Sequence, residues 1–240
     1  MDQSSLRQSH QLHRREAVRW LASLQPESID HFITDPPYGV ALKLGTKSKV
    51  RLASSIRGDG RVEARKLWEQ FVPLMARAAR PDTLHLVFSG WSNNWALDVL
   101  REHFRVVSCI VWHKRPPGLG HFTRSAHEEI FLLAKGQPPR LSTATADVWQ
   151  AARVTRPLHP CQKPVPLLVR CIELVSSPGE LIADPFAGIG STAVAAVESG
   201  RQFVGCEIEP RFAALGRRRI KSSQQLVQGG THADRHVRHR

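Results

Sequence analysis

The sequence has few of the residues that mark secreted, metal-binding or membrane proteins. Four cysteines occur in 240 residues and none form a C-x-x-C pair, which argues against zinc-ribbon and redox motifs. We expect these thiols to be reduced, as in a cytoplasmic protein. No apolar run is long enough to cross a bilayer. No apolar stretch follows the first charged residues, so no secretory signal is expected.

Acidic residues are also scarce. The chain has 21 Asp and Glu against 34 Lys and Arg, which gives a net charge of +13. Residues 43–66 carry eight basic and two acidic residues, and residues 211–240 carry eight basic residues and one acidic residue. Such concentrations predict a polyanionic partner. From the charge alone, the alternative interpretation is that the first segment is a solubilising loop and the second a disordered tail.

The length of 240 residues favours one domain. Apolar runs predict strands at 29–34, 84–89, 105–114, 129–134, 180–183 and 202–207, and helical periodicity predicts helices at 15–24, 66–79, 96–103, 163–174, 193–199 and 210–220. This alternation predicts an α/β fold with a mainly parallel sheet. Residues 40–66 read as a basic mobile loop, residues 136–158 show no sustained pattern, and residues 223–240 read as a basic, disordered tail beyond a single domain at 1–222.

A glycine-rich turn follows the predicted strand at 180–183. Gly188 and Gly190 allow a sharp turn and a close backbone approach to a ligand. The third glycine of dinucleotide sites is replaced by Ala193, and Glu207 lies 17 positions after Gly190, close to the spacing of a ribose-binding acid. The pattern favours an adenosine ligand with an anion smaller than a pyrophosphate. A tight turn that only packs is the alternative.

A second turn, Asp35-Pro36-Pro37-Tyr38, follows the predicted strand at 29–34 and contains the only tyrosine of the chain. A Pro-fixed structural turn is one interpretation. The other is a site for the exocyclic amine of a base. The Asp35 carboxylate and the Pro36 carbonyl can accept the two amine hydrogens, and Tyr38 offers a face for stacking a flipped base.

These residues, with His159-Pro160-Cys161-Gln162-Lys163-Pro164 and the FxGxG at Phe186–Gly190, resemble the S-adenosylmethionine-dependent amino methyltransferases of DNA. The resemblance covers about residues 14–220. The catalytic motif precedes the cofactor motif, as in the circularly permuted β class. The resemblance implies a Rossmann-like, seven-stranded, mostly parallel sheet with one reversed strand, and a compact enzyme of a phage-like or solitary type.

The resemblance also implies roles for individual residues. The target base would be held by Asp35, Pro36, Pro37 and Tyr38. His159 would order its turn rather than act in chemistry. The cofactor S-adenosyl-L-methionine would be held by Asp184, Phe186, Gly188, Gly190, Ser191 and Thr192, with Glu207 on its ribose and Gln162 and Lys163 near its carboxylate. No metal is implied. Transfer would be direct and in-line, helped by positioning and desolvation.

The chain departs from the family pattern in three places. Cys161 replaces a usual Thr, Phe212 stands where Tyr is common, and residues 136–158 are too short for a full recognition domain. DNA contacts are therefore expected from this insert, from the basic loop at 40–66 and from the loop at 114–126. The residues expected to make them are Lys43, Lys47, Lys49, Arg51, Arg57, Arg61, Lys114, Arg115 and Arg124.

The Asp of DPPY favours N6 of adenine over N4 of cytosine, where Ser is common at this position. The same chemistry on RNA, a catalytically silent DNA-binding relative and a dinucleotide oxidoreductase are the remaining alternatives. A homodimer and a cognate restriction nuclease, as in restriction-modification systems, are further expectations of the family.

Overall fold

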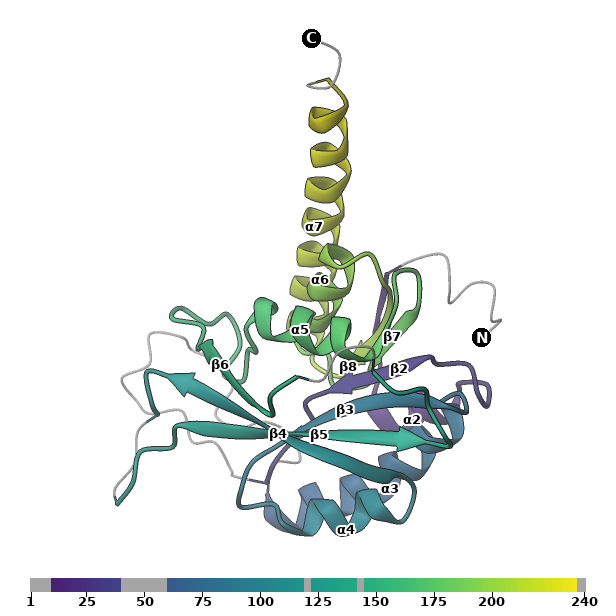
Figure 1. The fold of residues 1–240 in the computed structure, drawn as a ribbon, viewed down its shortest axis with the longest axis vertical. Coiled ribbons are helices and arrows are strands. Elements are labelled where there is room, and N and C mark those ends of the chain that lie inside the picture. The colour runs from purple at the N-terminus through teal and green to yellow at the C-terminus, as the bar shows by residue number, and fades with distance from the viewer. Residues whose placement is uncertain (1–9, 40–59, 119–121, 142–144, 237–240) are drawn as a thin grey trace.

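The computed structural model describes residues 10–39, 60–118, 122–141 and 145–236. They form an α/β structure around one sheet with the order β1-β8-β7-β2-β3-β5-β4-β6 (Figure 1). The strands are β1 (Gln11–Arg14), β2 (His31–Thr34), β3 (Thr83–Ser89), β4 (Arg105–Arg115), β5 (His127–Lys135), β6 (Val148–Ala152), β7 (Leu181–Asp184) and β8 (Gln202–Glu207). Among these described strands, only β5 runs against its neighbours, which confirms the predicted mostly parallel sheet with one reversed strand.

The sheet has eight strands, so the expected number of seven was wrong. The sequence reading missed β1 and β6, which lie at the two edges of the sheet. Each of these strands has a single buried residue, Leu12 in β1 and Trp149 in β6, so neither forms an apolar run in the sequence. An edge strand has one neighbour and needs fewer apolar residues than a central strand.

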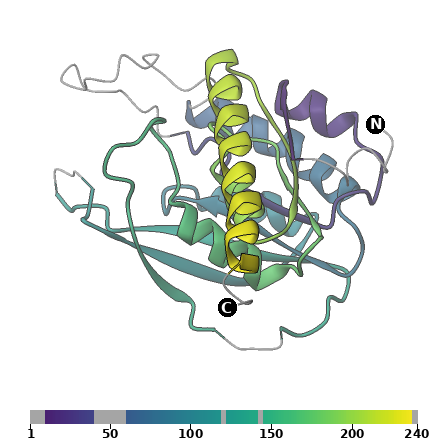
Figure 2. The ribbon, with the colours of Figure 1, turned by 90° about the horizontal axis from the view of Figure 1, so that it is seen from above.

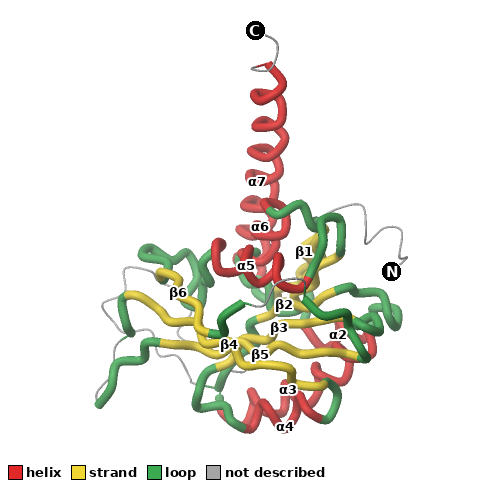
Figure 3. The backbone as a smooth tube through the Cα atoms, in the orientation of Figure 1, coloured by secondary structure: helices red, strands yellow, loops and turns green. Residues whose placement is uncertain are grey.

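Helices cover both faces of the sheet (Figure 3). They are α2 (Ala17–Ala22), α3 (Arg61–Ala78), α4 (Trp95–Arg101), α5 (Val165–Val175), α6 (Ser191–Glu198) and α7 (Pro210–His236). One apolar core joins α2, α3 and α4 to the sheet, and a second joins it to α5 and α6. The alternating side chains of the central strands supply both cores, because successive residues of a strand point to opposite faces.

Helix α7 differs from its prediction. The sequence predicts a helix at 210–220 followed by disorder from residue 223, whereas the structure continues the helix to His236. The C-terminal half of α7 projects away from the sheet (Figure 1), and in the view from above it lies in front of the body (Figure 2). The turns up to Ile220 are packed, and extending an existing helix avoids the cost of nucleation.

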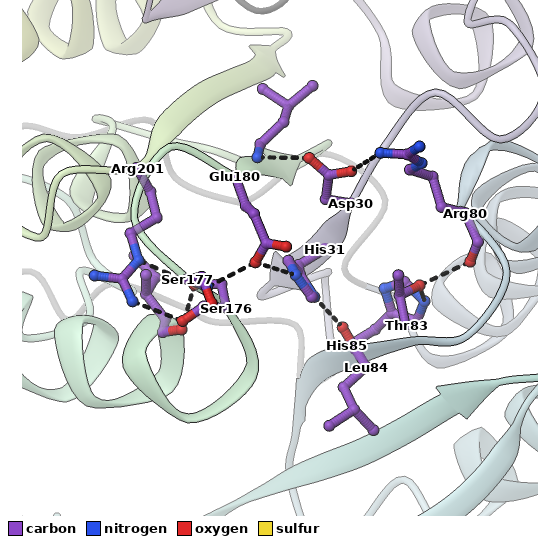
Figure 4. Close-up of polar contacts among 12 residues, drawn as sticks. Asp30, His31, Arg80, Thr83, Leu84, His85, Ser176, Ser177, Glu180 and Arg201 are labelled. Carbon is purple, nitrogen blue, oxygen red and sulfur yellow. Dashed lines mark hydrogen bonds and ion pairs between the residues drawn. The ribbon is translucent and has the colours of Figure 1, made fainter. Parts of the chain in front are cut away.

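A polar network holds together the amino ends of β2, β3 and β7 (Figure 4). The ring of His31 contacts the Leu84 carbonyl at 2.8 Å and a carboxylate oxygen of Glu180 at 3.1 Å. Asp30 accepts a hydrogen bond from Arg80 at 2.8 Å. The network satisfies polar groups at the amino ends of these three strands. The carboxyl ends of the parallel strands, on the opposite side of the sheet, carry both of the turns singled out in the sequence.

Within the described residues, no helix is long and apolar enough to cross a membrane.

Candidate active site

The DPPY turn and the glycine-rich turn face each other across one cavity of about 400 Å³. They meet because β2 pairs in parallel with β7, with His31 opposite Ile182 and Phe32 opposite Ala183. Both strands therefore end at the same edge of the sheet, where α/β proteins bind ligands. Of the predicted base-binding and cofactor-binding residues, the cavity is lined by Asp35, Pro36, Pro37, Tyr38, Gln162, Lys163, Asp184, Phe186, Gly188, Ser191, Thr192 and Glu207. Gly190 is the N-cap of α6 and lies in the chain between Ile189 and Ser191, which both line the cavity.

The carboxylate of Asp35 has a donor on each oxygen. The Tyr38 hydroxyl donates to Oδ1, and the Lys163 ammonium donates to Oδ2. Burial raises the pKa of Asp35, and the positive charge of Lys163 opposes that rise. Burial also raises the pKa of Tyr38 well above its usual value, with Asp35 adding to the effect. Tyr38 is therefore a neutral hydrogen-bond donor to the Asp35 carboxyl group.

Glu128 on β5 completes this group and was missed by the sequence reading. Its carboxylate lies 3.2 Å from Lys163 Nζ and 3.1 Å from Lys114 Nζ. Burial would raise the pKa of Glu128, but the two ammonium groups outweigh it and the pKa is lowered. Asp35, Glu128, Lys163 and Lys114 thus form a cluster of two negative and two positive side chains. Glu128 and Glu129 are adjacent, so the sequence alone does not indicate which of the two side chains points toward Lys163.

The backbone of the DPPY turn is held from the α3 side. The indole Nε1 of Trp68 donates to the Pro37 carbonyl at 3.0 Å. The ring of Trp68 packs against Phe71 and, edge-on, against Trp95, with centroids 5.4 and 5.5 Å apart. Two prolines fix φ in the turn itself. The acceptors of the turn are therefore held by a buried aromatic cluster.

Asp184 organises the glycine-rich turn from its centre. Its carboxylate accepts from the hydroxyls of Thr34 and Thr192, each at 2.7 Å, and from the backbone N–H of Phe186 at 3.0 Å. Burial raises its pKa to about 6, and the threonine hydrogen bonds oppose that rise. Thr34 directly precedes Asp35, so this buried carboxylate joins the ends of the two strands.

The glycine-rich turn uses backbone angles that favour glycine. Gly188 has φ +52° and Gly190 has φ +72°, and Gly190 precedes the first turn of α6. At the far side, the Glu207 carboxylate accepts from the N–H groups of Gly188 at 3.0 Å and Glu209 at 2.7 Å. Burial raises the pKa of Glu207. The cavity thus has an acidic acceptor at the end of β8 and a helix N-terminus beside the glycines.

His159 and Gln162 hold the turn that precedes α5. His159 Nδ1 accepts from the Cys161 N–H at 3.2 Å, and its ring meets Phe212 edge-on at 4.4 Å. The Gln162 side-chain oxygen accepts from the Leu158 N–H at 2.8 Å. The two hydrogen bonds are internal to the turn, and the ring contact joins the turn to α7. Lys163, the next residue, is directed at Asp35.

Replacing His159 with Asn should weaken the acid sensitivity of the fold. Burial lowers the pKa of His159 to about 4, with Lys163 adding to the effect. As the pH falls from about 6.5 towards 4, the unfolded chain binds a proton that the folded chain excludes, so stability present above pH 6.5 is lost. The loss is up to about 3 kcal/mol. Asn keeps an acceptor for Cys161. Urea unfolding at several pH values checks this. It would be contradicted if the free energy of unfolding changed equally with pH in both proteins.

The predicted DNA-binding residues are separated by the structure. Lys43, Lys47, Lys49, Arg51 and Arg57 lie outside the described residues. Arg61, at the start of α3, is exposed, as are Arg115, the last residue of β4, and Arg124 in the segment that follows. This segment leaves the sheet on the same side as the DPPY turn, because β3 and β4 both run against β5 and β3 is parallel to β2.

Lys114 does not fit its predicted role as a surface cation. It is 8% exposed, and its ammonium is paired with Glu128. The reason is the alternation of β4, which directs Ile110, Trp112 and Lys114 to the covered face.

The comparison with protein families shows to which family this chain belongs. The family model for DNA methylases matches residues 29–218, which include both turns and the residues between them. The chain belongs to the DNA methylase family. It is an S-adenosylmethionine-dependent DNA methyltransferase, as the resemblance predicted.

Individual relatives align over most of this methylase. The protein YubD of Escherichia coli (strain K12) is 31% identical over 224 residues, covering 91% of this chain and 93% of YubD. The DNA adenine methyltransferase YhdJ of the same strain is 26% identical over 251 residues, covering 85% of this chain and 80% of YhdJ. A DNA modification methylase of Thermus thermophilus, crystallised with S-adenosyl-L-methionine, shares the fold at a TM-score of 0.69 and 22% identity, covering 89% of this chain and 94% of that one.

The cavity of this methylase has the chemistry that S-adenosyl-L-methionine requires. Its walls are mostly apolar, and Glu207 offers carboxylate oxygens at the end of β8 for ribose hydroxyls. The N–H groups at the start of α6 suit the methionine carboxylate. Asp35 lines the same cavity beside the DPPY turn. Within the described residues, no group of three or more His, Cys, Asp or Glu side chains could hold a metal ion.

Proposed function

We propose that this methylase transfers the methyl group to N6 of adenine in DNA. The observation that carries the proposal is the carboxylate of Asp35, with Tyr38 beside it, in the lining of the cavity that also contains the glycine-rich turn. The name of YhdJ, a DNA adenine methyltransferase aligned over 85% of this chain, supports adenine. Asp at the first position of the DPPY turn supports the same base.

The protein's part in the reaction is to position the amine and exclude water. The Asp35 carboxylate accepts one amine hydrogen and the Pro36 carbonyl accepts the other, which directs the nitrogen lone pair at the methyl carbon. Tyr38 supplies a face on which the flipped base stacks. Bound S-adenosyl-L-methionine supplies a methyl group activated by its sulfonium. The amine proton is released after transfer, and Asp35 is the nearest carboxylate to receive it.

Cofactor binding is divided between three segments in this proposal. Phe186, Gly188 and Thr192 line the methionine end, and Glu207 binds the ribose hydroxyls. Asp184 acts indirectly, since its oxygens are occupied by Thr34, Thr192 and the N–H of Phe186. Lys163 serves the base site rather than the cofactor carboxylate, because its ammonium contacts Asp35 and Glu128.

DNA would lie across the edge of the sheet at which β2, β3 and β4 end. Arg61, Arg115 and Arg124 are exposed cations at or near this edge. A second copy of the chain and a cognate restriction nuclease remain predictions of the family resemblance. Size-exclusion chromatography of the purified protein, with and without a DNA duplex, checks the first of these.

Nucleoside mass spectrometry tests the proposed base. Purified protein, unmethylated DNA and S-adenosyl-L-methionine are incubated, and the DNA is digested to nucleosides. We expect N6-methyladenine. N4-methylcytosine would keep the fold and the mechanism but contradict the proposed base. Methyl transfer to RNA alone would contradict the proposed substrate.

A further inference from the structure

The buried charges beneath the DPPY turn are arranged around one lysine. Lys163 Nζ contacts Asp35 Oδ2 and lies 3.2 Å from Glu128 Oε2. Its side chain is 9% exposed, and those of Asp35 and Glu128 are each 19% exposed. The ammonium also lies over the rings of Tyr38 and Phe88, at 5.4 and 5.2 Å from their centroids. Lys163 is therefore enclosed between two carboxylates and two aromatic faces.

This arrangement poses a problem for base binding. Asp35 must accept a hydrogen from the incoming amine, yet the Lys163 ammonium already donates to it. A donor that stays on the carboxylate weakens it as an acceptor. A buried ammonium cannot simply leave its partner, because an unpaired buried charge is strongly unfavourable. Release of Asp35 requires a second acceptor within reach of Lys163.

Glu128 meets this requirement. We propose that Glu128 is a positioning residue, which takes the Lys163 ammonium when the target base enters and so leaves Oδ2 of Asp35 free to accept the amine hydrogen, while Tyr38 keeps its hydrogen bond to Oδ1. The inference rests on the proposed methyl transfer to a base amine. Glu128 Oε2 is already within hydrogen-bond distance of Lys163, so the transfer needs only a small rotation of the lysine side chain.

Lys114 allows Glu128 to do this. Its ammonium lies 3.1 Å from the other oxygen of Glu128, Oε1. One oxygen of Glu128 therefore stays with Lys114 and the other is available to Lys163. Lys114 also approaches the ring of Trp112, at 5.8 Å from the centroid. Glu128 is thus fixed by a cation that does not touch Asp35 or the base site.

The test compares three variants with the wild-type protein. Glu128→Gln keeps the size of the side chain and removes its charge. We expect kcat for methyl transfer to fall about 10- to 100-fold, as for the loss of an interaction made only in the reactive complex. The Kd values for S-adenosyl-L-methionine and for a DNA duplex should change less than about threefold. Glu129→Gln is the matched control, because Glu129 follows Glu128 directly and its side chain points to the other face of β5. We expect this variant to have wild-type kcat.

The third variant separates positioning from a structural role. In Glu128→Gln/Lys163→Met the ammonium that competes for Asp35 is absent, so kcat should recover several-fold relative to Glu128→Gln alone. Thermal unfolding of each variant establishes that it is folded. Wild-type kcat in Glu128→Gln, or no recovery in the double variant, would overturn the proposal. A wild-type protein that methylates no base would instead overturn the proposed function, and this inference with it.

Discussion

Replacing Asp35 with Asn should nearly abolish methyl transfer while leaving the fold and the cofactor site intact. The amide cannot accept with both of its polar atoms, so the amine loses the acceptor that directs its lone pair. We expect kcat to fall on the order of 10²- to 10³-fold, the range seen when one preorganised polar contact to a transition state is removed. Lys163 keeps Glu128 as a partner at 3.2 Å, so no buried cation is left unpaired.

Single-turnover incorporation of labelled methyl groups, at saturating cofactor and DNA, measures this effect. Calorimetry with S-adenosyl-L-methionine should give a wild-type Kd for Asp35→Asn. Asp98→Asn is the control, because Asp98 lies on the exposed side of α4 and its replacement removes a carboxylate elsewhere in the protein. Near-wild-type turnover in a folded Asp35→Asn protein would mean that Asp35 does not orient the amine.

Replacing Trp68 with Ala should give the largest loss of stability. The side chain is fully buried, packs against Phe71 and Trp95, and donates to the Pro37 carbonyl. Truncating a buried Trp to Ala removes about 3–5 kcal/mol from the free energy of unfolding. Trp68→Phe keeps most of the ring contact but leaves the carbonyl of Pro37 without its donor, so we expect a smaller loss of about 1–3 kcal/mol.

Urea unfolding checks both Trp68 variants, and a third tryptophan serves as the control. Trp91 is 69% exposed, so Trp91→Ala should change the free energy of unfolding by less than about 0.5 kcal/mol. Trp68→Phe should also reduce kcat, because the DPPY turn loses the contact that fixes its backbone. A Trp68→Phe protein with wild-type turnover would show that the two prolines hold the turn unaided.

The central strands and the two turns could be predicted because their signals are local. Phe32 and Ile33 of β2 and Ile182 and Ala183 of β7 are buried on both faces, which gives short apolar runs. The turns that follow are marked by proline and glycine, whose backbone preferences do not depend on distant contacts. The edge strands β1 and β6 have no such run, since most of their stability comes from pairing with one neighbour.

The charge cluster could be predicted only in part. Motif spacing places Lys163 near the cavity, but the direction of its side chain depends on Asp35, 128 positions earlier in the chain. Lys114 was interpreted as a DNA contact because it was placed in the loop at 114–126, whereas the alternation of β4 buries its side chain. Glu128 and its neighbour Glu129 are chemically identical in the sequence. The register of β5 against β3 and β4 distinguishes them.

The pairing of β2 with β7 has a consequence for the synthesis of this enzyme. The two strands lie about 150 residues apart in the chain, and β1 pairs with β8, which is still later. A growing chain that ends before β7 therefore leaves β2 with an open edge, and its DPPY turn faces no glycine-rich turn. Contacts of such long range also slow folding. We expect that an incomplete chain cannot methylate DNA, because the DPPY turn and the glycine-rich turn meet only when β7 has paired with β2.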